Sequence, residues 1–183
     1  MGKEFPRMDD DHRAFIARQR IFFTASAARA ARVNVSPRER EAFRIVDDVT
    51  AVYLDRTGSG AETAAHLLAD GRLTIMFCAF DGPPNILRLY GRARALRRGS
   101  ADYDAMLARA FDGAEPAGAR QIVQLDVELV KTSCGYGVPL FEHRGPRRSL
   151  DNWAKAKTDA ELDAYRRQKN MVSMDGLPTG LVD

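Results

Sequence analysis

A glycine-rich stretch, DRTGSGAETAAH at residues 55–66, has the composition of an anion-binding loop. Gly58 and Gly60 permit backbone conformations in which successive N–H groups point to one side, and a helix that follows adds the positive end of its dipole. Three hydroxyl side chains are available as further donors, those of Thr57, Ser59 and Thr63. The stretch has neither the GK[ST] ending of a Walker loop nor GxGxxG spacing, and the same residues suit an ordinary strand-to-helix turn. The sequence of this stretch is compatible with a phosphate-binding loop and with an ordinary turn.

Arginine residues could supply the positive charge that a phosphate needs. The formal net charge is only +3, but arginines cluster in RLYGRARALRR, which begins at Arg88. In a strand, Arg88, Tyr90, Arg92 and Arg94 would share one face. A solvated arginine face is the simplest interpretation of Arg92 and Arg94. The modest charge and the single aromatic residue of this face disfavour a nucleic acid as the partner.

Other reactive side chains form no recognisable centre. Cys78 and Cys134 have neither CxxC nor zinc spacing, which predicts free thiols, with Cys134 as a small buried side chain. The three histidines share no ligand pattern with them, so no metal site is expected. Glu62 and His66 stand four residues apart in a predicted helix, which favours a structural contact between them. The sequence assigns no catalytic residue.

Length and composition indicate one soluble domain. A chain of 183 residues with 45% hydrophobic content can bury one substantial core. No apolar run approaches the roughly 18 residues of a membrane helix, and the first fifteen residues lack the apolar core of a secretory signal. We therefore expect a cytoplasmic protein that does not associate with membranes.

Hydrophobic periodicity predicts a mainly β protein of the α+β class. Strands are expected over 21–27, 32–36, 43–46, 49–55, 72–80, 86–96 and 120–133, and helical segments over 9–20, 61–70, 100–113 and 149–170. Most strands follow one another as hairpins, which favours a small antiparallel barrel with peripheral helices over a doubly wound sheet. The strand over 72–80 is apolar on both faces, which predicts burial on both sides, in the barrel or at a subunit contact.

The order of RVNVSP, FRIVDDVTAVYLDRTGSGAETAAHL and GRLTIMFCAFDGPPNILRLYGRARAL resembles the pyridoxamine 5′-phosphate oxidase-related family of FMN-binding split barrels. The resemblance covers roughly residues 15–100 and continues more weakly through SCGYGVPLFE and NMVSMDGLP. It implies a six-stranded antiparallel split barrel over residues 1–148, with residues 149–183 as a helical extension of the same domain. It also implies a homodimer with FMN in grooves between the subunits.

The resemblance further implies where FMN would bind. The flavin ring would lie along the strand at 32–36, and the phosphate near the loop and helix start at 57–63. The residues expected to contact FMN are Arg32, Val33, Asn34, Val35, Ser36, Thr57, Gly58, Ser59, Gly60, Thr63 and Arg88.

Departures from the family pattern change the expected chemistry. Pyridoxamine phosphate oxidases carry an Arg-Lys pair where this chain has Glu62 and Thr63, so another cation must meet the phosphate. The candidates are Arg32, Arg56 and Arg88, with Arg88 acting across the dimer interface. The C-terminal sequence has no Arg-x-His-like substrate motif, which disfavours pyridoxamine phosphate as the substrate.

The preferred interpretation is an FMN-dependent oxidoreductase that acts on a small-molecule substrate, with NAD(P)H as a candidate electron donor. Two alternatives use the same barrel: a deazaflavin-dependent reductase, and a non-enzymatic protein that binds or senses flavin or haem. Flavin binding requires no catalytic acid or base. The lack of an assigned catalytic residue therefore does not distinguish these three interpretations.

Overall fold

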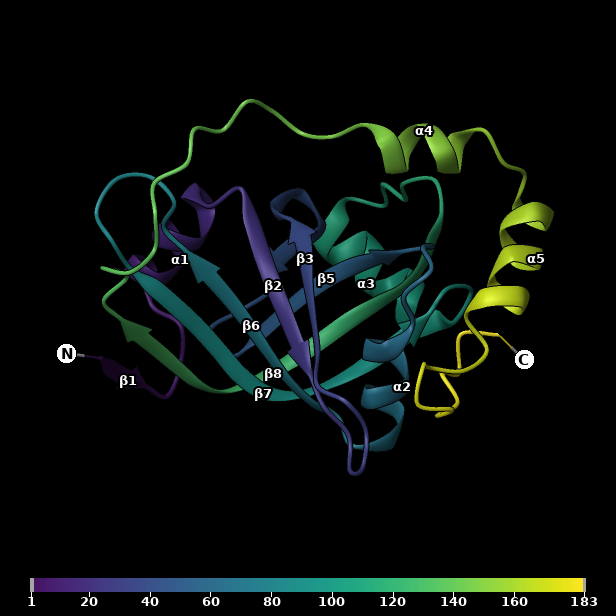
Figure 1. The fold of residues 1–183 in the computed structure, drawn as a ribbon, viewed down its shortest axis with the longest axis horizontal. Coiled ribbons are helices and arrows are strands. Elements are labelled where there is room, and N and C mark those ends of the chain that lie inside the picture. The colour runs from purple at the N-terminus through teal and green to yellow at the C-terminus, as the bar shows by residue number, and fades with distance from the viewer. Residues whose placement is uncertain (1, 183) are drawn as a thin grey trace.

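Alternating apolar residues build one antiparallel sheet in the order β3-β2-β6-β7-β8-β5-β4, with β1 paired to β8. The computed structural model describes residues 2–182 (Figure 1). The strands are β1 (Lys3–Phe5), β2 (Ile21–Ser26), β3 (Asn34–Glu39), β4 (Phe43–Ile45), β5 (Thr50–Arg56), β6 (Arg72–Cys78), β7 (Ile86–Arg97) and β8 (Ala119–Ser133). The helices are α1 (Asp10–Arg18), the 3₁₀ turn η1 (Arg40–Ala42), α2 (Glu62–Ala69), α3 (Ala101–Phe111), α4 (Ser149–Lys155) and α5 (Asp159–Lys169).

The sheet curls into a half-barrel, so the split-barrel prediction is confirmed. Six strands have six or more residues, as expected, and the three-residue strands β1 and β4 bring the sheet to eight. Strands β3 and β5 are not neighbours in the hydrogen-bonded ladder. The side chains of Arg38 in β3 and Asp55 in β5 nevertheless meet, which closes the open seam of the half-barrel.

Gly91 allows the two longest strands to bend. The register between β7 and β8 shifts between Tyr90 and Gly91. A Cβ atom on Gly91 would lie 1.9 Å from the carbonyl oxygen of Asp126, so only glycine fits this bulge. The bulge lies near the middle of β7 and increases the local twist of the sheet.

Two apolar clusters hold the sheet in place. The larger includes Phe22, Tyr53 and Phe77 and extends to Phe15 and Ile16 of α1, and the smaller packs α3 against the sheet. Alternate residues of β5 enter the two clusters, and Ala51 to Asp55 are all buried. Within one chain β6 leaves Met76 half-exposed on its outer face, and β5 is the strand covered on both sides, so the second face of 72–80 could be covered only at a subunit contact, which stays a prediction.

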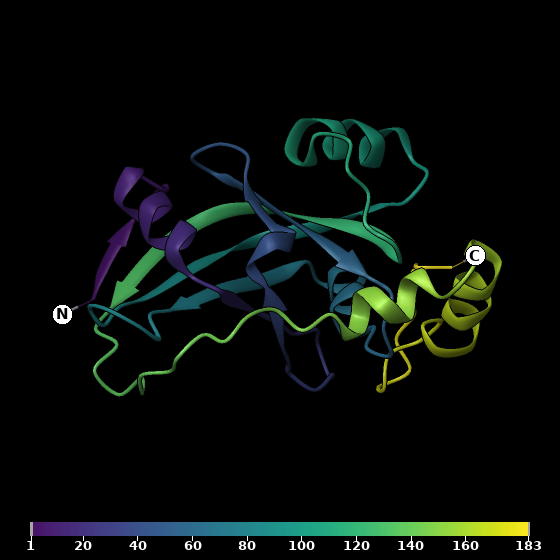
Figure 2. The ribbon, with the colours of Figure 1, turned by 90° about the horizontal axis from the view of Figure 1, so that it is seen from above.

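The helices lie at the periphery, and two boundaries differ from expectation. Figure 2 shows α3 on one side of the curled sheet and the segment leading to α4 on the other. The helical segment over 149–170 is two helices, because Thr158 caps α5 through a bond from the Glu161 N–H. The strand expected at 32–36 begins at Asn34. No helix among residues 2–182 is long and apolar enough to span a membrane.

Residues 134–148 form an extended segment, here called the strap, which connects β8 to α4 across the rim of the sheet (Figures 1 and 2). Most of its residues are exposed. Phe141 fixes the strap to the sheet, because its N–H donates to the carbonyl oxygen of Phe80 at 2.9 Å and the two rings pack edge to face. Cys134 at its start is exposed, which corrects the expected burial, while Cys78 is buried and both thiols are free.

Candidate functional site

The start of β3 and the start of α2, the two segments in which FMN contacts are predicted, meet. The Asn34 side-chain amide donates to the Thr63 hydroxyl at 3.0 Å and to the Ser36 hydroxyl at 3.3 Å. Asn34, Ser36 and Arg38 alternate along β3 and so share one face, where the Arg38 guanidinium reaches Thr24. This face of β3 is polar and turned toward α2 and β5.

The opposite face of β3 is open: it carries Val35, Pro37 and Glu39, and Val33 is exposed just before the strand. The exposed fraction is 71% for Val33 and 61% for Val35. Within residues 2–182, strand β3 pairs only with β2, so the backbone groups of its other edge are not used in the sheet. Arg32 lies before the strand, where its guanidinium and its backbone N–H both bond to the Asp175 carboxylate.

The glycine loop, residues 57–60, turns its carbonyl groups toward the protein. The Asn170 amide donates to the carbonyl oxygen of Gly58 at 2.9 Å and more weakly to that of Ser59 at 3.4 Å. The Arg120 guanidinium donates to the carbonyl oxygen of Gly60 at 2.7 Å. In a trans peptide the C=O and the following N–H point in opposite directions. The N–H groups of Ser59 and Gly60, which follow the Gly58 and Ser59 carbonyl groups, are therefore directed away from Asn170.

Thr57 stabilises this loop from within. Its hydroxyl donates to the carbonyl oxygen of Gly118 at 2.8 Å and accepts from the Arg166 guanidinium at 2.9 Å. The side chain is fully buried. Thr57 therefore anchors the loop, while Ser59 at its exposed tip keeps its hydroxyl at the surface.

A buried charge cluster lies beneath the loop. Asp55 accepts from Arg38 at 2.7 Å, from Arg120 at 2.8 Å and from the Gln121 amide at 2.8 Å. Burial alone would raise the pKa of the Asp55 carboxyl, but the charges of Arg120 and Arg38 lower it to about 2. One carboxylate thus faces two guanidinium groups, which leaves this cluster with one positive charge in excess.

The first turn of α2 carries a carboxylate of its own. Glu62 accepts from the backbone N–H of Ala61 at 3.0 Å, one of the donors that a helix start would offer an anion. His66 pairs with the Ser26 hydroxyl at 2.9 Å, and its buried Nε2 atom has no hydrogen-bond partner among the described residues. The expected Glu62–His66 contact is replaced by these two separate partners.

The guanidinium groups of the other predicted cations, Arg56 and Arg88, bond to residues outside the glycine loop of their own chain. Arg88 donates to the Ser133 hydroxyl at 3.2 Å. The end of α2 meets β7 at Ala93, five residues after Arg88, where the Ala93 N–H donates to the carbonyl oxygen of Gly71. Arg56 donates to the Ala117 carbonyl oxygen and pairs with Asp151 at 2.7 Å.

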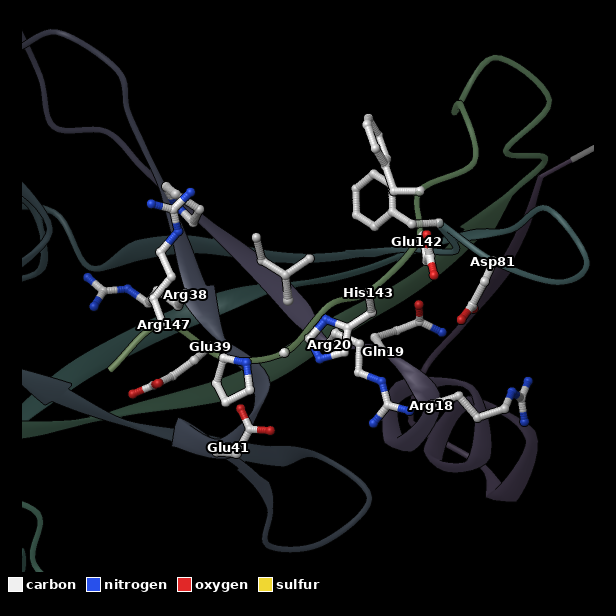
Figure 3. A pocket seen from close by; sticks show the side chains of 16 residues that line it. Arg18, Gln19, Arg20, Arg38, Glu39, Glu41, Asp81, Glu142, His143 and Arg147 are labelled. Atoms are coloured by element: carbon white, nitrogen blue, oxygen red, sulfur yellow. The ribbon is translucent and has the colours of Figure 1, made fainter. Parts of the chain in front are cut away.

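A cavity of about 590 Å³ opens between the strap and the sheet (Figure 3). Its apolar wall comes from Ile21, Pro37, Phe80 and Phe141. Its charged lining comes from four segments: the end of α1, the turn from β3 into η1, Asp81 after β6, and strap residues that include His143 and Arg147. Arg38 also lines it, so the cavity adjoins the seam that carries the buried charge cluster.

Comparison with known proteins decides the family. Residues 8–134 match the family model described as pyridoxamine 5′-phosphate oxidase, which is more than half of the chain. The chain belongs to the pyridoxamine 5′-phosphate oxidase family. A relative from Aspergillus flavus, the pyridoxamine 5′-phosphate oxidase family protein ustO, is 35% identical over 190 residues, which cover 95% of this chain and 76% of that protein.

Solved structures agree with membership of the pyridoxamine 5′-phosphate oxidase family at the level of the fold. A variant of HupZ from Group A Streptococcus is 20% identical, with a TM-score of 0.55 over 68% of this chain and 98% of that chain. A candidate pyridoxamine 5′-phosphate oxidase from Lactobacillus delbrueckii is 14% identical, with a TM-score of 0.54 over 69% of this chain and 94% of that one. At these identities the likeness is one of fold.

Sequence reasoning missed the residues that support the loop of this family member. Asp55 did give a sequence signal, because it is a charged residue at the end of an apolar strand, where a buried carboxylate needs a hydrogen-bonding or charged partner. Arg120 and Asn170 gave no comparable signal, because nothing local in the sequence shows that residues 50 and 112 positions apart meet.

Proposed function

We propose that this protein is an FMN-dependent oxidoreductase that acts on a small-molecule substrate as a homodimer. The orientation of the glycine loop is the observation that carries the proposal: the inward carbonyl groups of Gly58 and Ser59 leave the N–H groups of Ser59 and Gly60 facing outward, and excess positive charge lies beneath them. Backbone N–H groups and positive charge are what a phosphate monoester requires. Membership of the pyridoxamine 5′-phosphate oxidase family supports the same ligand.

The edge of β3 suits the flavin ring. A flavin carries hydrogen-bond donors and acceptors along one edge and an apolar face, which can match a free strand edge beside exposed Val33 and Val35. Asn34 connects this strand to Thr63 and so fixes the distance between the ring and phosphate subsites. The bound flavin would supply the redox chemistry. The protein residues would bind it, orient it and hold the substrate.

The outer face of the sheet supports the homodimer. Val35 lies opposite Ala25, and Phe23 lies opposite Met76, so partly exposed apolar side chains continue from β3 across β2 to β6. A second copy of the chain would cover this face. We expect sedimentation to give a dimer at micromolar concentration, and a stable monomer there would contradict the shared flavin site.

Titration with FMN and with riboflavin tests the ligand. We expect quenching of flavin fluorescence at much lower concentrations of FMN, because riboflavin has no phosphate for the loop. Equal affinities would show that the loop is only a turn. Anaerobic addition of NADH or NADPH to the FMN complex then tests the enzyme: loss of the yellow flavin absorbance supports an oxidoreductase, and persistent colour with both donors contradicts NAD(P)H as the donor.

One observation favours a haem-binding alternative. His143 lies in the wall of the cavity under the strap, where an imidazole could ligate iron. Titration with haem would show a shifted absorption band that is lost in His143→Ala. An unchanged haem spectrum in the presence of the protein would dismiss this alternative.

A further inference from the structure

The last turn of α5 reaches the inner side of the glycine loop. Asn170, the residue that ends α5, is completely buried. Its amide nitrogen donates to the carbonyl oxygen of Gly58 at 2.9 Å, while its amide oxygen accepts from the Arg120 guanidinium at 3.1 Å. Thr179 fixes the backbone at this point, because its hydroxyl donates to the carbonyl oxygen of Asn170. One neutral side chain therefore binds both the loop and the cation beneath it.

The amide is suited to this place because it both donates and accepts. A carboxylate would accept from Arg120 equally well but would turn a second acceptor toward the Gly58 carbonyl oxygen. It would also neutralise the positive charge that remains after Arg38 and Arg120 pair with Asp55. An amide keeps the loop carbonyl groups turned inward and leaves the charge of the cluster unchanged.

We propose that Asn170 is a positioning residue for the phosphate subsite. By holding the Gly58 and Ser59 carbonyl groups, it keeps the Ser59 and Gly60 N–H groups directed outward, where a flavin nucleotide's phosphate would meet them. The inference rests on the proposed function, because it concerns the same loop. It assigns a role in cofactor selection to the C-terminal extension.

The isosteric variant Asn170→Asp tests this role in the full-length protein. We expect the dissociation constant for FMN to rise about tenfold or more, because the loop loses its donor and the cluster loses its excess charge. The dissociation constant for riboflavin should change less than about twofold. Asn152→Asp is the matched control, because Asn152 is exposed on α4 and the same change there should alter neither affinity.

Two results would overturn the proposal. Equal weakening of FMN and riboflavin binding would mean that Asn170 serves folding alone, and unchanged FMN affinity in folded Asn170→Asp would mean that the loop needs no such support. If Asn170→Asp does not fold by circular dichroism, Asn170→Ala provides the same comparison without the added charge, and we expect FMN affinity to fall more than riboflavin affinity. Failure of the wild-type protein to prefer FMN is a different result, which overturns the proposed function itself.

Discussion

The Arg38 guanidinium lies 2.7 Å from the buried Asp55 carboxylate, across the seam where β3 and β5 share no backbone hydrogen bond. Thr24 and the ring of Tyr53 complete the surroundings of Arg38, with the guanidinium carbon 4.8 Å from the ring centre. The seam is therefore held by side chains and charge. Its stability should depend on the ionisation of one carboxyl group.

We expect Asp55→Asn to destabilise the fold by about 3 to 5 kcal/mol, because it leaves two buried guanidinium groups without their counter-charge. Urea unfolding at neutral pH measures the loss. Exposed Asp102→Asn on α3 is the control, since its pair with Arg94 is solvated and should contribute less than about 1 kcal/mol. A loss of similar size in both variants would show that the seam does not depend on Asp55.

Acid should weaken the wild-type fold through the same group. The pKa of Asp55 falls from 3.8 to about 2 on folding, so its contribution is fully present above pH 4 and is lost as the pH falls toward 2. Linkage gives about 2 kcal/mol for this shift. The free energy of unfolding, measured between pH 5 and 2, should therefore fall more steeply in the wild type than in Asp55→Asn.

Glu62 should oppose phosphate binding, because its carboxylate accepts from the Ala61 N–H at the edge of the proposed subsite. Glu62→Gln removes this charge at nearly constant volume. We expect FMN to bind about two- to fivefold more tightly, the range for one charge near a helix start, with riboflavin unaffected. Tighter binding of both ligands, or of neither, would place Glu62 outside the phosphate's reach.

Arg88 remains the candidate for a cation supplied by the partner subunit. Arg88→Ala should weaken FMN binding by about 1.5 to 3 kcal/mol if it makes a charge-assisted bond to the phosphate, while riboflavin binding hardly changes. Arg94→Ala is the control, because Arg94 is exposed and pairs with Asp102. Fluorescence titration of both variants with both ligands separates the outcomes. Unchanged FMN affinity in Arg88→Ala would leave the Asp55 cluster as the main source of positive charge.

The strap should be the first site of proteolysis. Residues 139–148 are exposed and contain Arg144, Arg147 and Arg148. We expect trypsin to cut there before any strand or helix, and the two fragments to co-elute in gel filtration because buried Arg166 and Asn170 join them. Mass spectrometry identifies the cut. Phe141→Ala should accelerate it by releasing the strap from Phe80, and first cleavage within α3 would contradict this picture.

Sequence alone predicted most of the elements because their signals are local, but it missed β1 and joined α4 and α5 into one helical segment. The Ser100 cap of α3, Gly71 after α2, and the alternation along β8 each marked a boundary or a face that the structure confirms. The family resemblance supplied the split barrel. It also placed the ring and phosphate subsites near Asn34 and Thr63, which are in contact, and that placement stays a prediction.

The support beneath the loop could not be predicted in this way. Arg120 and Asn170 act through contacts that exist only after the chain has folded, and each looks ordinary in its own segment. Glycine content suggested a cradle without showing which way the peptide groups turn. That direction depends on partners far along the chain, and local periodicity contains no information about them.

The position of Asn170 also determines when the loop can be completed during synthesis. A ribosome makes Gly58 more than a hundred residues before Asn170, and the strands of the half-barrel lie between the two or before them. The sheet can therefore assemble on the nascent chain while the loop carbonyl groups still lack one of their donors. Binding of the proposed FMN would then wait until α5 has emerged, after the barrel has formed.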